Sequence, residues 1–267
     1  MSSKLLIKPH ARDAEGCVLR ITPESAGWKY VGFEVFALRP GDRLEPDTRG
    51  REICIVLLSG SAEVTVKGKS LGTLGPRRNP FEDKPSSVYV PPAAGVVVNA
   101  TTAVEVAICA APAVGRFEPR LIPPADVGEE IRGTGTNTRY VRNILPETRE
   151  AERLLVVEVL TPGGNWSSYP PHKHDSSVGG ETQLEETYYH RLARSGGFAF
   201  QRVYTDDRSL DESVAAEDGD VVLVPRGYHP VGAPHGIDLY YLNVMAGPDR
   251  RWRITNAPGY DFLAPPR

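Results

Sequence analysis

Apolar residues recur in short runs along the chain, and glycine, proline, asparagine or aspartate closes most of these runs. The runs are rich in valine, isoleucine and aromatic residues, which is typical of β-strands. The clearest segments are 31–38, 51–58, 62–68, 87–91, 96–100, 104–111, 154–160, 185–190, 198–204, 220–225 and 238–247. Long helical periodicity is scarce, and only GEEIRG and SLDESVAAEDG suggest short helices or turns. The pattern therefore predicts an all-β protein built from sandwiches or barrels.

The two halves of the chain resemble each other. Three pairs of segments match in the same order: FALRPGD with EVLTPGG, SSVYVPPAAG with DVVLVPRGYH, and CAAP with VMAGP. The offset grows from 122 positions (Phe36 to Glu158) to 134 (Ser86 to Asp220), which indicates an insertion in the second half. Chance similarity among strands separated by glycine and proline is the alternative, but the shared order favours duplication. We expect two tandem β units, residues 1–122 and 123–267.

Composition and charge set limits on the class of protein. The chain has 267 residues, of which 40% are hydrophobic and 24% charged, as in ordinary globular proteins. The net charge is −3 and the sequence contains no basic stripe, so we expect no nucleic-acid partner. No apolar stretch approaches a membrane span, and MSSKLLIKPHARD lacks the apolar core of a signal peptide. Three scattered cysteines suggest a reducing compartment, so we expect a soluble, cytoplasmic protein without a membrane partner.

The second half contains a candidate metal site. In a strand, alternate side chains share a face, so His172 and His174 point the same way. Glu186 lies in the next strand-like run, EETYYH, and His229 ends GDVVLVPRGYH after a Pro/Gly turn. Neutral imidazoles and a carboxylate suit Zn, Mn, Fe or Ni. A His-x-His pair alone is more often a surface or packing feature, but with Glu186 and His229 we predict one divalent ion.

The first half cannot build the same site. It has no histidine between Phe36 and Pro112, and the repeat places Gly95 opposite His229 and Glu52 opposite Glu186. We therefore expect no metal in residues 1–122. That half would serve packing and shaping, or would form a homo-oligomer.

The candidate ligands carry a resemblance to the cupin superfamily. The segment from Gly164 to His174 resembles its first motif, with seven residues instead of five before His172. EETYYH resembles the familiar cupin phrase in which the second glutamate binds metal. Gly219, Pro225 and Gly227 match the second motif, although His229 comes one residue early. The resemblance implies a two-domain cupin (bicupin) of two tandem jelly-roll β-barrels, in which only the second carries metal ligands.

Longer phrases resemble a narrower family. ETQLEETYYHRL, GFAFQRVYTDDRSLDE and DGDVVLVPRGYHPVGAPHGIDLYYLNVMAGPDRRW are similar to the 5-deoxy-glucuronate isomerases of myo-inositol catabolism, and so is RGTGTNTRYVRNILPE. This resemblance implies an aldose–ketose isomerase that converts 5-deoxy-D-glucuronate to 5-dehydro-2-deoxy-D-gluconate. The substrate class would be a uronate-type sugar acid, and the metal would stabilise charge on the reacting oxygens.

Strand alternation selects further candidates for that reaction. His190 shares a face with Glu186, and we expect it to be the base because a free imidazole titrates near neutrality. Tyr188 would bind the substrate or pack. Arg202 and Arg142 are candidates for binding the substrate carboxylate, or are structural. A hydride shift in place of proton transfer stays open, as do a metal-dependent cupin dioxygenase and a non-catalytic sugar-binding cupin.

Overall fold

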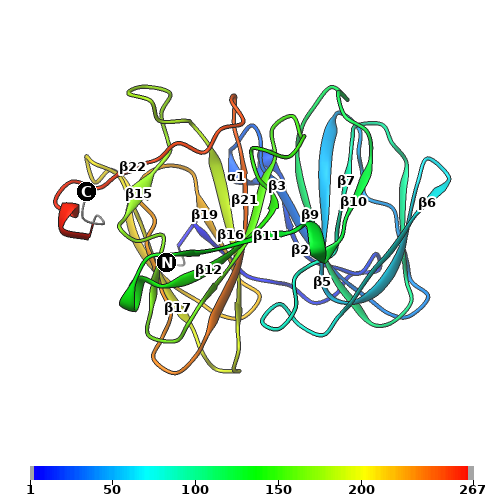
Figure 1. Ribbon diagram of the computed structural model, residues 1–267, viewed down its shortest axis with the longest axis horizontal. Coiled ribbons are helices and arrows are strands. Elements are labelled where there is room, and N and C mark those ends of the chain that lie inside the picture. Colours follow the sequence, from blue (N-terminus) through cyan, green and yellow to red (C-terminus); the bar gives the residue numbers. More distant parts are fainter. Residues whose placement is uncertain (1–2, 264–267) are drawn as a thin grey trace.

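The computed structural model of this chain describes residues 3–263, and its regular structure is almost entirely β. Figure 1 shows two β-rich halves side by side, with the N-terminal half in blue to green and the C-terminal half in green to red. The all-β prediction is confirmed. Within residues 3–263 the helices are α1 (Pro23–Ala26) and the 3-10 helices η1 (Pro124–Asp126), η2 (Gly135–Asn137) and η3 (Asp261–Leu263).

A nine-stranded sheet makes the N-terminal half. Six strands run in the order β10-β7-β5-β9-β3-β2, while β6 and β8 pair with β5, and β4 pairs with β8. The strands are β2 (Cys17–Ile21), β3 (Gly32–Leu38), β4 (Arg43–Leu44), β5 (Arg51–Val66), β6 (Lys69–Arg77), β7 (Ser87–Val90), β8 (Val96–Ala100), β9 (Val104–Pro112) and β10 (Arg120–Ile122).

Three sheets make the C-terminal half, with seven, four and two strands. Their orders are β1-β19-β16-β21-β13-β12-β11, β14-β20-β17-β18 and β15-β22. The strands are β1 (Leu6–Ile7), β11 (Gly128–Arg132), β12 (Arg139–Leu145), β13 (Leu155–Thr161), β14 (Trp166–Ser167), β15 (His172–Lys173), β16 (Glu185–Leu192), β17 (Ala199–Tyr204), β18 (Asp211–Ala216), β19 (Val221–Val224), β20 (Val231–Gly232), β21 (Leu239–Ala246) and β22 (Thr255–Asn256).

Most expected strands form, with two kinds of difference. Segments 51–58 and 62–68 join into the single strand β5, whose pairing with β6 shifts register after Gly60. Gly60 has φ of +88°, and a Cβ there would lie 2.1 Å from the carbonyl oxygen of Ala103, so only glycine fits this bend. The expectation of short helices or turns in GEEIRG and SLDESVAAEDG is wrong, because most of each segment pairs as a strand, β11 and β18.

The N-terminal strand crosses between the halves. Leu6 and Ile7 of β1 pair with Val222 and Val221 of β19, at the edge of the seven-stranded sheet. These residues lie inside the segment 1–122, which the sequence assigned to the first unit. The first described strand of the chain therefore extends the sheet of the second half.

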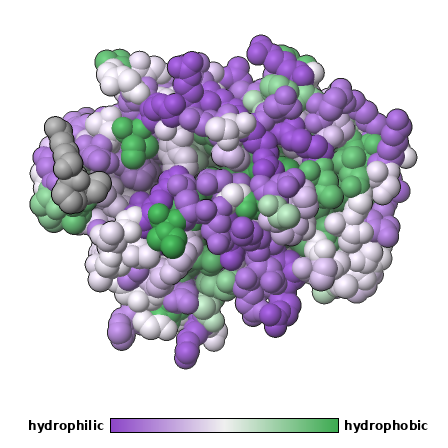
Figure 2. All heavy atoms as spheres, in the orientation of Figure 1, coloured by the Kyte–Doolittle hydropathy of each residue, from purple (hydrophilic) through white to green (hydrophobic). Residues whose placement is uncertain are grey.

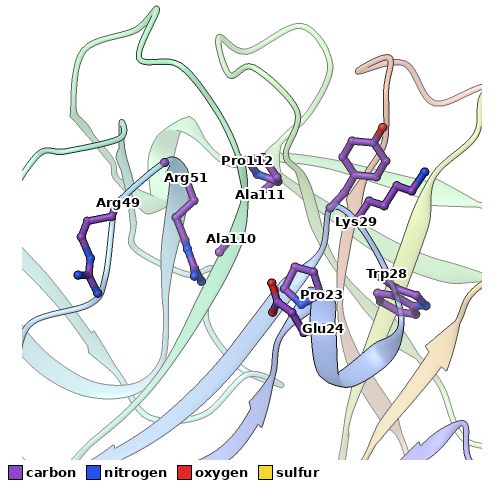
Figure 3. A pocket seen from close by; sticks show the side chains of 12 residues that line it. Pro23, Glu24, Trp28, Lys29, Arg49, Arg51, Ala110, Ala111 and Pro112 are labelled. Atoms are coloured by element: carbon purple, nitrogen blue, oxygen red, sulfur yellow. The ribbon is translucent and has the colours of Figure 1, made fainter.

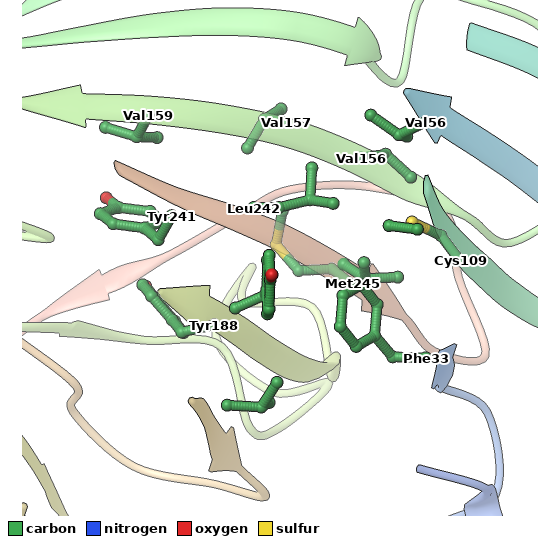
Figure 4. Packing of buried hydrophobic residues seen from close by; sticks show 14 of the residues in the cluster. Phe33, Val56, Cys109, Val156, Val157, Val159, Tyr188, Tyr241, Leu242 and Met245 are labelled. Carbon is green, nitrogen blue, oxygen red and sulfur yellow. The ribbon is translucent and has the colours of Figure 1, made fainter. Parts of the chain in front are cut away.

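An apolar layer joins the two halves. Figure 4 shows Phe33, Val56 and Cys109 from the first half beside Val156 and Met245 from the second. All five are buried and belong to one hydrophobic cluster. A separate cluster lies wholly within residues 17–110 and fills the interior of the first half. Burial of apolar surface between the halves stabilises one arrangement of the two sheets.

Two glutamates, the buried Glu52 and the partly buried Glu185, clamp the halves reciprocally. The carboxylate of Glu52, on β5, accepts the backbone N–H groups of residues 152–154 at 2.6–2.8 Å, just before β13. The carboxylate of Glu185, on β16, accepts those of residues 29–31 at 2.8–3.0 Å, just before β3. Each half thus holds the start of a strand in the other half, and the two contacts are related by the internal repeat.

These contacts also correct the alignment of the halves. Glu52 pairs with Ala111 of β9, and Glu185 pairs with Ala246 of β21. The structural counterpart of Glu52 is therefore Glu185, one residue before the Glu186 that the sequence repeat suggested. Glu186 corresponds instead to Ile53, a buried apolar residue.

The surface and the cysteines add two observations. On the face shown in Figure 2, hydrophilic residues dominate and hydrophobic ones emerge in separate groups. Cys17, Cys54 and Cys109 are free and buried. No helix within residues 3–263 has the length and apolar character required to cross a bilayer.

We predict that Glu52→Gln weakens the fold, because the amide cannot accept three backbone N–H groups and the Tyr89 hydroxyl, which Glu52 also binds at 2.7 Å. Each buried donor left unpaired costs about 1–3 kcal/mol. Urea unfolding should show a lower free energy of unfolding for Glu52→Gln. The control is Glu63→Gln, an exposed position on the same strand. Equal stability of the two variants would contradict the clamp.

Candidate metal centre

Three of the four predicted ligands form a compact, buried cluster. Glu186 Oε2 lies 3.1 Å from His174 Nε2 and 3.2 Å from His229 Nε2. One donor atom of each residue falls within 4.8 Å of the others. Glu186 comes from β16, His174 follows β15, and His229 follows the turn after β19. The structure thus brings together residues 55 positions apart at one end of the seven-stranded sheet.

His172 lies beside this trio. Its ring centroid is 4.9 Å from that of His229 and 6.3 Å from that of His174. Only His172 of the pair is in strand β15, which is two residues long and pairs with β22. Both imidazoles of the pair lie near Glu186 and His229, but His172 lies outside the compact trio.

Backbone carbonyl groups fix the orientation of the three imidazoles. Each ring has Nδ1 beside a carbonyl oxygen: His172 beside Pro170 (3.3 Å), His174 beside Leu184 (3.3 Å) and His229 beside Gly227 (2.9 Å). A protonated Nδ1 donates to that oxygen, which leaves the lone pair of Nε2 free. The local chain therefore selects the tautomer that a metal ligand requires.

The charge state of the cluster follows from burial. Burial lowers the pKa of both His172 and His229 to about 3, so these rings are neutral at neutral pH. Burial also acts against a charged His174, but the hydrogen bond and negative charge of Glu186 outweigh it and raise its pKa. Neutral imidazoles and one carboxylate are the donor set that divalent transition metals take.

An unsatisfied atom supports the fit. His229 Nε2 is buried and has no hydrogen-bond partner in the described chain, although it lies close to Glu186. A buried nitrogen without a partner is destabilising unless something else occupies its lone pair. The residues His172, His174, Glu186 and His229 therefore fit one divalent ion.

Tyr188 and His190 follow Glu186 on the same face of β16. The Tyr188 hydroxyl lies 2.8 Å from Ser168 Oγ, and its ring centroid is 5.7 Å from that of His229. His190 lies further along the strand, with Nε2 at 3.0 Å from Gln201 Oε1 and a buried Nδ1 without a partner in residues 3–263. Tyr188 thus stands between His190 and the cluster.

The structure does not bring Arg142 and Arg202 to the cluster. Arg142 Nη1 lies 3.0 Å from Glu158 Oε1 and also donates to carbonyl oxygens of residues 80 and 83 in the other half. Arg202 is exposed and binds both oxygens of Asp211 at 2.7 Å. Each guanidinium is already neutralised by a carboxylate within the chain, which accounts for its position outside the site.

Sequence reasoning missed Arg139 and Trp252. A cavity of about 390 Å³ opens beside His172, and both residues line it together with Arg132. Alternation along β12 separates Arg139 from Arg142, but both faces of this strand are partly buried, so the pattern did not distinguish them. Trp252 lies beyond the repeated segments and ends the long phrase that carries the family resemblance, but nothing in the sequence singled it out.

A second cavity, shown in Figure 3, has no histidine. It measures about 380 Å³ and lies beside α1 in the first half, with Lys29, Arg49 and Arg51 among its lining residues. His10 is the only histidine in the sequence of the first half, and Ile53 occupies the position that corresponds to Glu186. The candidate metal ligands of the described residues thus gather in the C-terminal half.

Comparison with known proteins identifies the family. A model described as the KduI/IolB family matches residues 5–263. The chain belongs to the KduI/IolB family. It is 54% identical over 263 residues to a protein of Geobacillus kaustophilus named 5-deoxy-glucuronate isomerase, covering 98% of this chain and 95% of the relative. A protein of the same name from Bacillus subtilis strain 168 is 44% identical over 267 residues, with 98% of both chains covered.

Solved structures agree with this membership. An IolB-like protein from Salmonella typhimurium LT2 superimposes with a TM-score of 0.94 at 48% identity, over 97% of this chain and 98% of that one. An oxalate decarboxylase from Bacillus subtilis gives a TM-score of 0.68 at 15% identity, over 99% and 81% of the two chains. The second likeness concerns the fold alone, and it supports a β-rich, cupin-like architecture for this KduI/IolB chain.

We predict that His174→Ala lowers bound metal from near one ion per chain to a small fraction, because it removes a central member of the compact trio. Elemental analysis after metal loading and desalting measures the ratio. The control is His235→Ala, since His235 is exposed and outside the cluster. Full occupancy in His174→Ala, or two equivalent tight sites in the unchanged protein, would contradict the assignment.

Proposed function

We propose that this chain is a 5-deoxy-glucuronate isomerase of myo-inositol catabolism, converting 5-deoxy-D-glucuronate to 5-dehydro-2-deoxy-D-gluconate. The observation that carries the proposal is the 44–54% identity, over nearly the full chain, to relatives with that name. The buried cluster of imidazoles and a carboxylate beside a cavity is consistent with it. The partner is then a small sugar acid, and the buried free cysteines suit a cytoplasmic enzyme.

The proposal includes a division of labour between two tandem jelly-roll barrels, residues 1–122 and 123–267. The repeated glutamate clamps and the two large sheets support such a duplication. The first barrel would carry no metal, since Ile53 stands where the second has Glu186. Its role is to pack against the second barrel and fix the strand that carries Glu186, and a homo-oligomer formed through its outer surface is compatible with this.

One divalent ion would be held by His172, His174, Glu186 and His229. Zn, Mn, Fe and Ni all suit this donor set. When bound, the ion would supply Lewis acidity toward the carbonyl and neighbouring hydroxyl of the sugar. The chain's own contribution is to keep His172 and His229 neutral, to orient all three imidazoles, and to surround the cluster with buried side chains that exclude water.

Isomerisation moves hydrogen between adjacent carbons, so the site needs a proton donor and an acceptor. Burial raises the pKa of Tyr188 well above its usual value, so this hydroxyl stays protonated and can donate. His190 is the proposed acceptor, because burial lowers its pKa to about 4 and leaves the ring neutral with Nδ1 free. The same low pKa makes His190 a weak base before substrate binds. Substitution of His190 therefore tests whether it accepts the proton.

We predict that the metal-loaded protein converts 5-deoxy-D-glucuronate to 5-dehydro-2-deoxy-D-gluconate, with product identified by NMR. The rate should be the same with and without oxygen, since isomerisation needs no oxidant. A chelated sample serves as the control. An oxygen-dependent, oxidised product would favour a cupin dioxygenase, and binding without turnover would favour a non-catalytic sugar-binding protein.

We predict that His190→Ala loses about 10²–10⁴-fold in kcat while keeping its metal, as expected on removal of a general base. Tyr188→Phe is the matched variant, because it removes only the hydroxyl that would donate. Reaction of the unchanged protein in D₂O should place deuterium on the carbon that receives hydrogen. Near-normal turnover in His190→Ala would return this residue to a packing role, and a product without deuterium would support a hydride shift.

A further inference from the structure

The cavity beside His172 is lined by both charged and aromatic side chains. It is lined by Arg132, Arg139 and Trp252, and Tyr169 and Asn256 complete much of its rim. A small inner chamber continues toward Tyr188, Tyr241 and Asn243, and His172, Arg132, Arg139 and Trp252 line this chamber too. The same two arginines and one tryptophan therefore line both cavities, which define a path past the candidate metal ligand His172.

Arg139 places a positive charge on this path, and no carboxylate of the described residues pairs with it. Its Nη1 donates to the carbonyl oxygens of Asn137 at 3.1 Å and Tyr169 at 3.2 Å. Within residues 3–263, its Nε and Nη2 make no hydrogen bond and no carboxylate lies within 4.0 Å. Burial lowers the pKa of the guanidinium, because the charge has lost water. Arg142, three residues along the same strand, is instead fully paired with Glu158.

Trp252 brings a second donor without an acceptor. Its indole Nε1 is buried and has no hydrogen-bond partner among the described residues. The Arg132 guanidinium stacks 4.8 Å from the centre of the Trp252 ring and also binds Glu130 at 2.6 Å. The ring is therefore held in place as part of the cavity wall, while its buried N–H group has no partner among the described residues. A buried N–H without an acceptor is unfavourable until a ligand supplies one.

An anionic ligand would satisfy both groups. A guanidinium presents planar, paired N–H donors that match a carboxylate, and charged hydrogen bonds of this kind are strong. The carboxylate and the aldehyde of a six-carbon sugar acid lie at opposite ends of the molecule. A subsite in the cavity wall can therefore bind the carboxylate while the aldehyde end points toward His172.

We propose that Arg139 and the indole N–H of Trp252 form the subsite that binds the carboxylate of the sugar-acid substrate. This inference rests on the proposed isomerase function for the identity of the substrate. It replaces Arg142 and Arg202 in that role. Arg132 contributes by fixing the Trp252 ring and adding positive charge near the cavity.

The test compares Arg139→Gln and Trp252→Phe with the unchanged holoenzyme. Arg139→Gln removes the charge at similar size, and Trp252→Phe removes the N–H but keeps an aromatic ring. We expect KM for 5-deoxy-D-glucuronate to rise roughly 10- to 100-fold in Arg139→Gln and less in Trp252→Phe, with smaller changes in kcat. The control is Arg194→Gln, an exposed arginine away from the cavity. Elemental analysis should show equal metal in all four proteins.

Binding of stable probes separates this inference from the proposed function. Calorimetry should show that the unchanged protein prefers D-glucuronate to the neutral D-glucose, and that Arg139→Gln loses this preference. Unchanged KM and unchanged preference in Arg139→Gln would overturn the subsite even if the isomerase activity is present. Loss of the preference in a protein that turns over no 5-deoxy-D-glucuronate would support the subsite and reject the function. If Arg139→Gln does not fold, Trp252→Phe decides by the same measurements.

Discussion

Glu185 and Glu186 face opposite sides of one strand, and this alternation connects the packing of the two halves to the geometry of the site. Glu185 points toward the first half and accepts three backbone N–H groups from residues 29–31. Glu186 points the other way, into the cluster with His174 and His229. A slip of β16 by one residue would exchange the two faces. The clamp therefore sets the position of the carboxylate around which the histidines gather.

A second buried carboxylate explains why several arginines are unavailable for substrate. Glu158 accepts from Arg77 of the first half at 2.7 Å, from Arg142 at 3.0 Å and from the Tyr240 hydroxyl at 3.0 Å. A buried charge is tolerated only when such partners surround it, and removal of one partner is strongly destabilising. The guanidinium of Arg142 is thus committed to the junction of the two halves, whereas Arg139 on the opposite face of β12 is not.

The sequence predicted those features that depend on near neighbours. Runs of β-branched and aromatic residues located most strands, and the spacing of His172, His174, Glu186 and His229 located the cluster with help from the family resemblance. The structure does not bring Arg142 and Arg202 to the cluster, because the position of an arginine side chain depends on which carboxylates fold close to it. Asp211 and Glu158 capture Arg202 and Arg142 through contacts that span 9 and 16 residues, and both faces of β12 are partly buried.

The crossing of β1 has a consequence for how the protein is made. Leu6 and Ile7 leave the ribosome early, but their partners Val222 and Val221 are synthesised more than 200 residues later. The first half can form its own interior cluster while the second half is still unmade. The N-terminal segment must then wait, unpaired, until β19 emerges and the seven-stranded sheet closes. Its docking joins residues that are far apart in the sequence, so it can occur only after most of the chain has been synthesised.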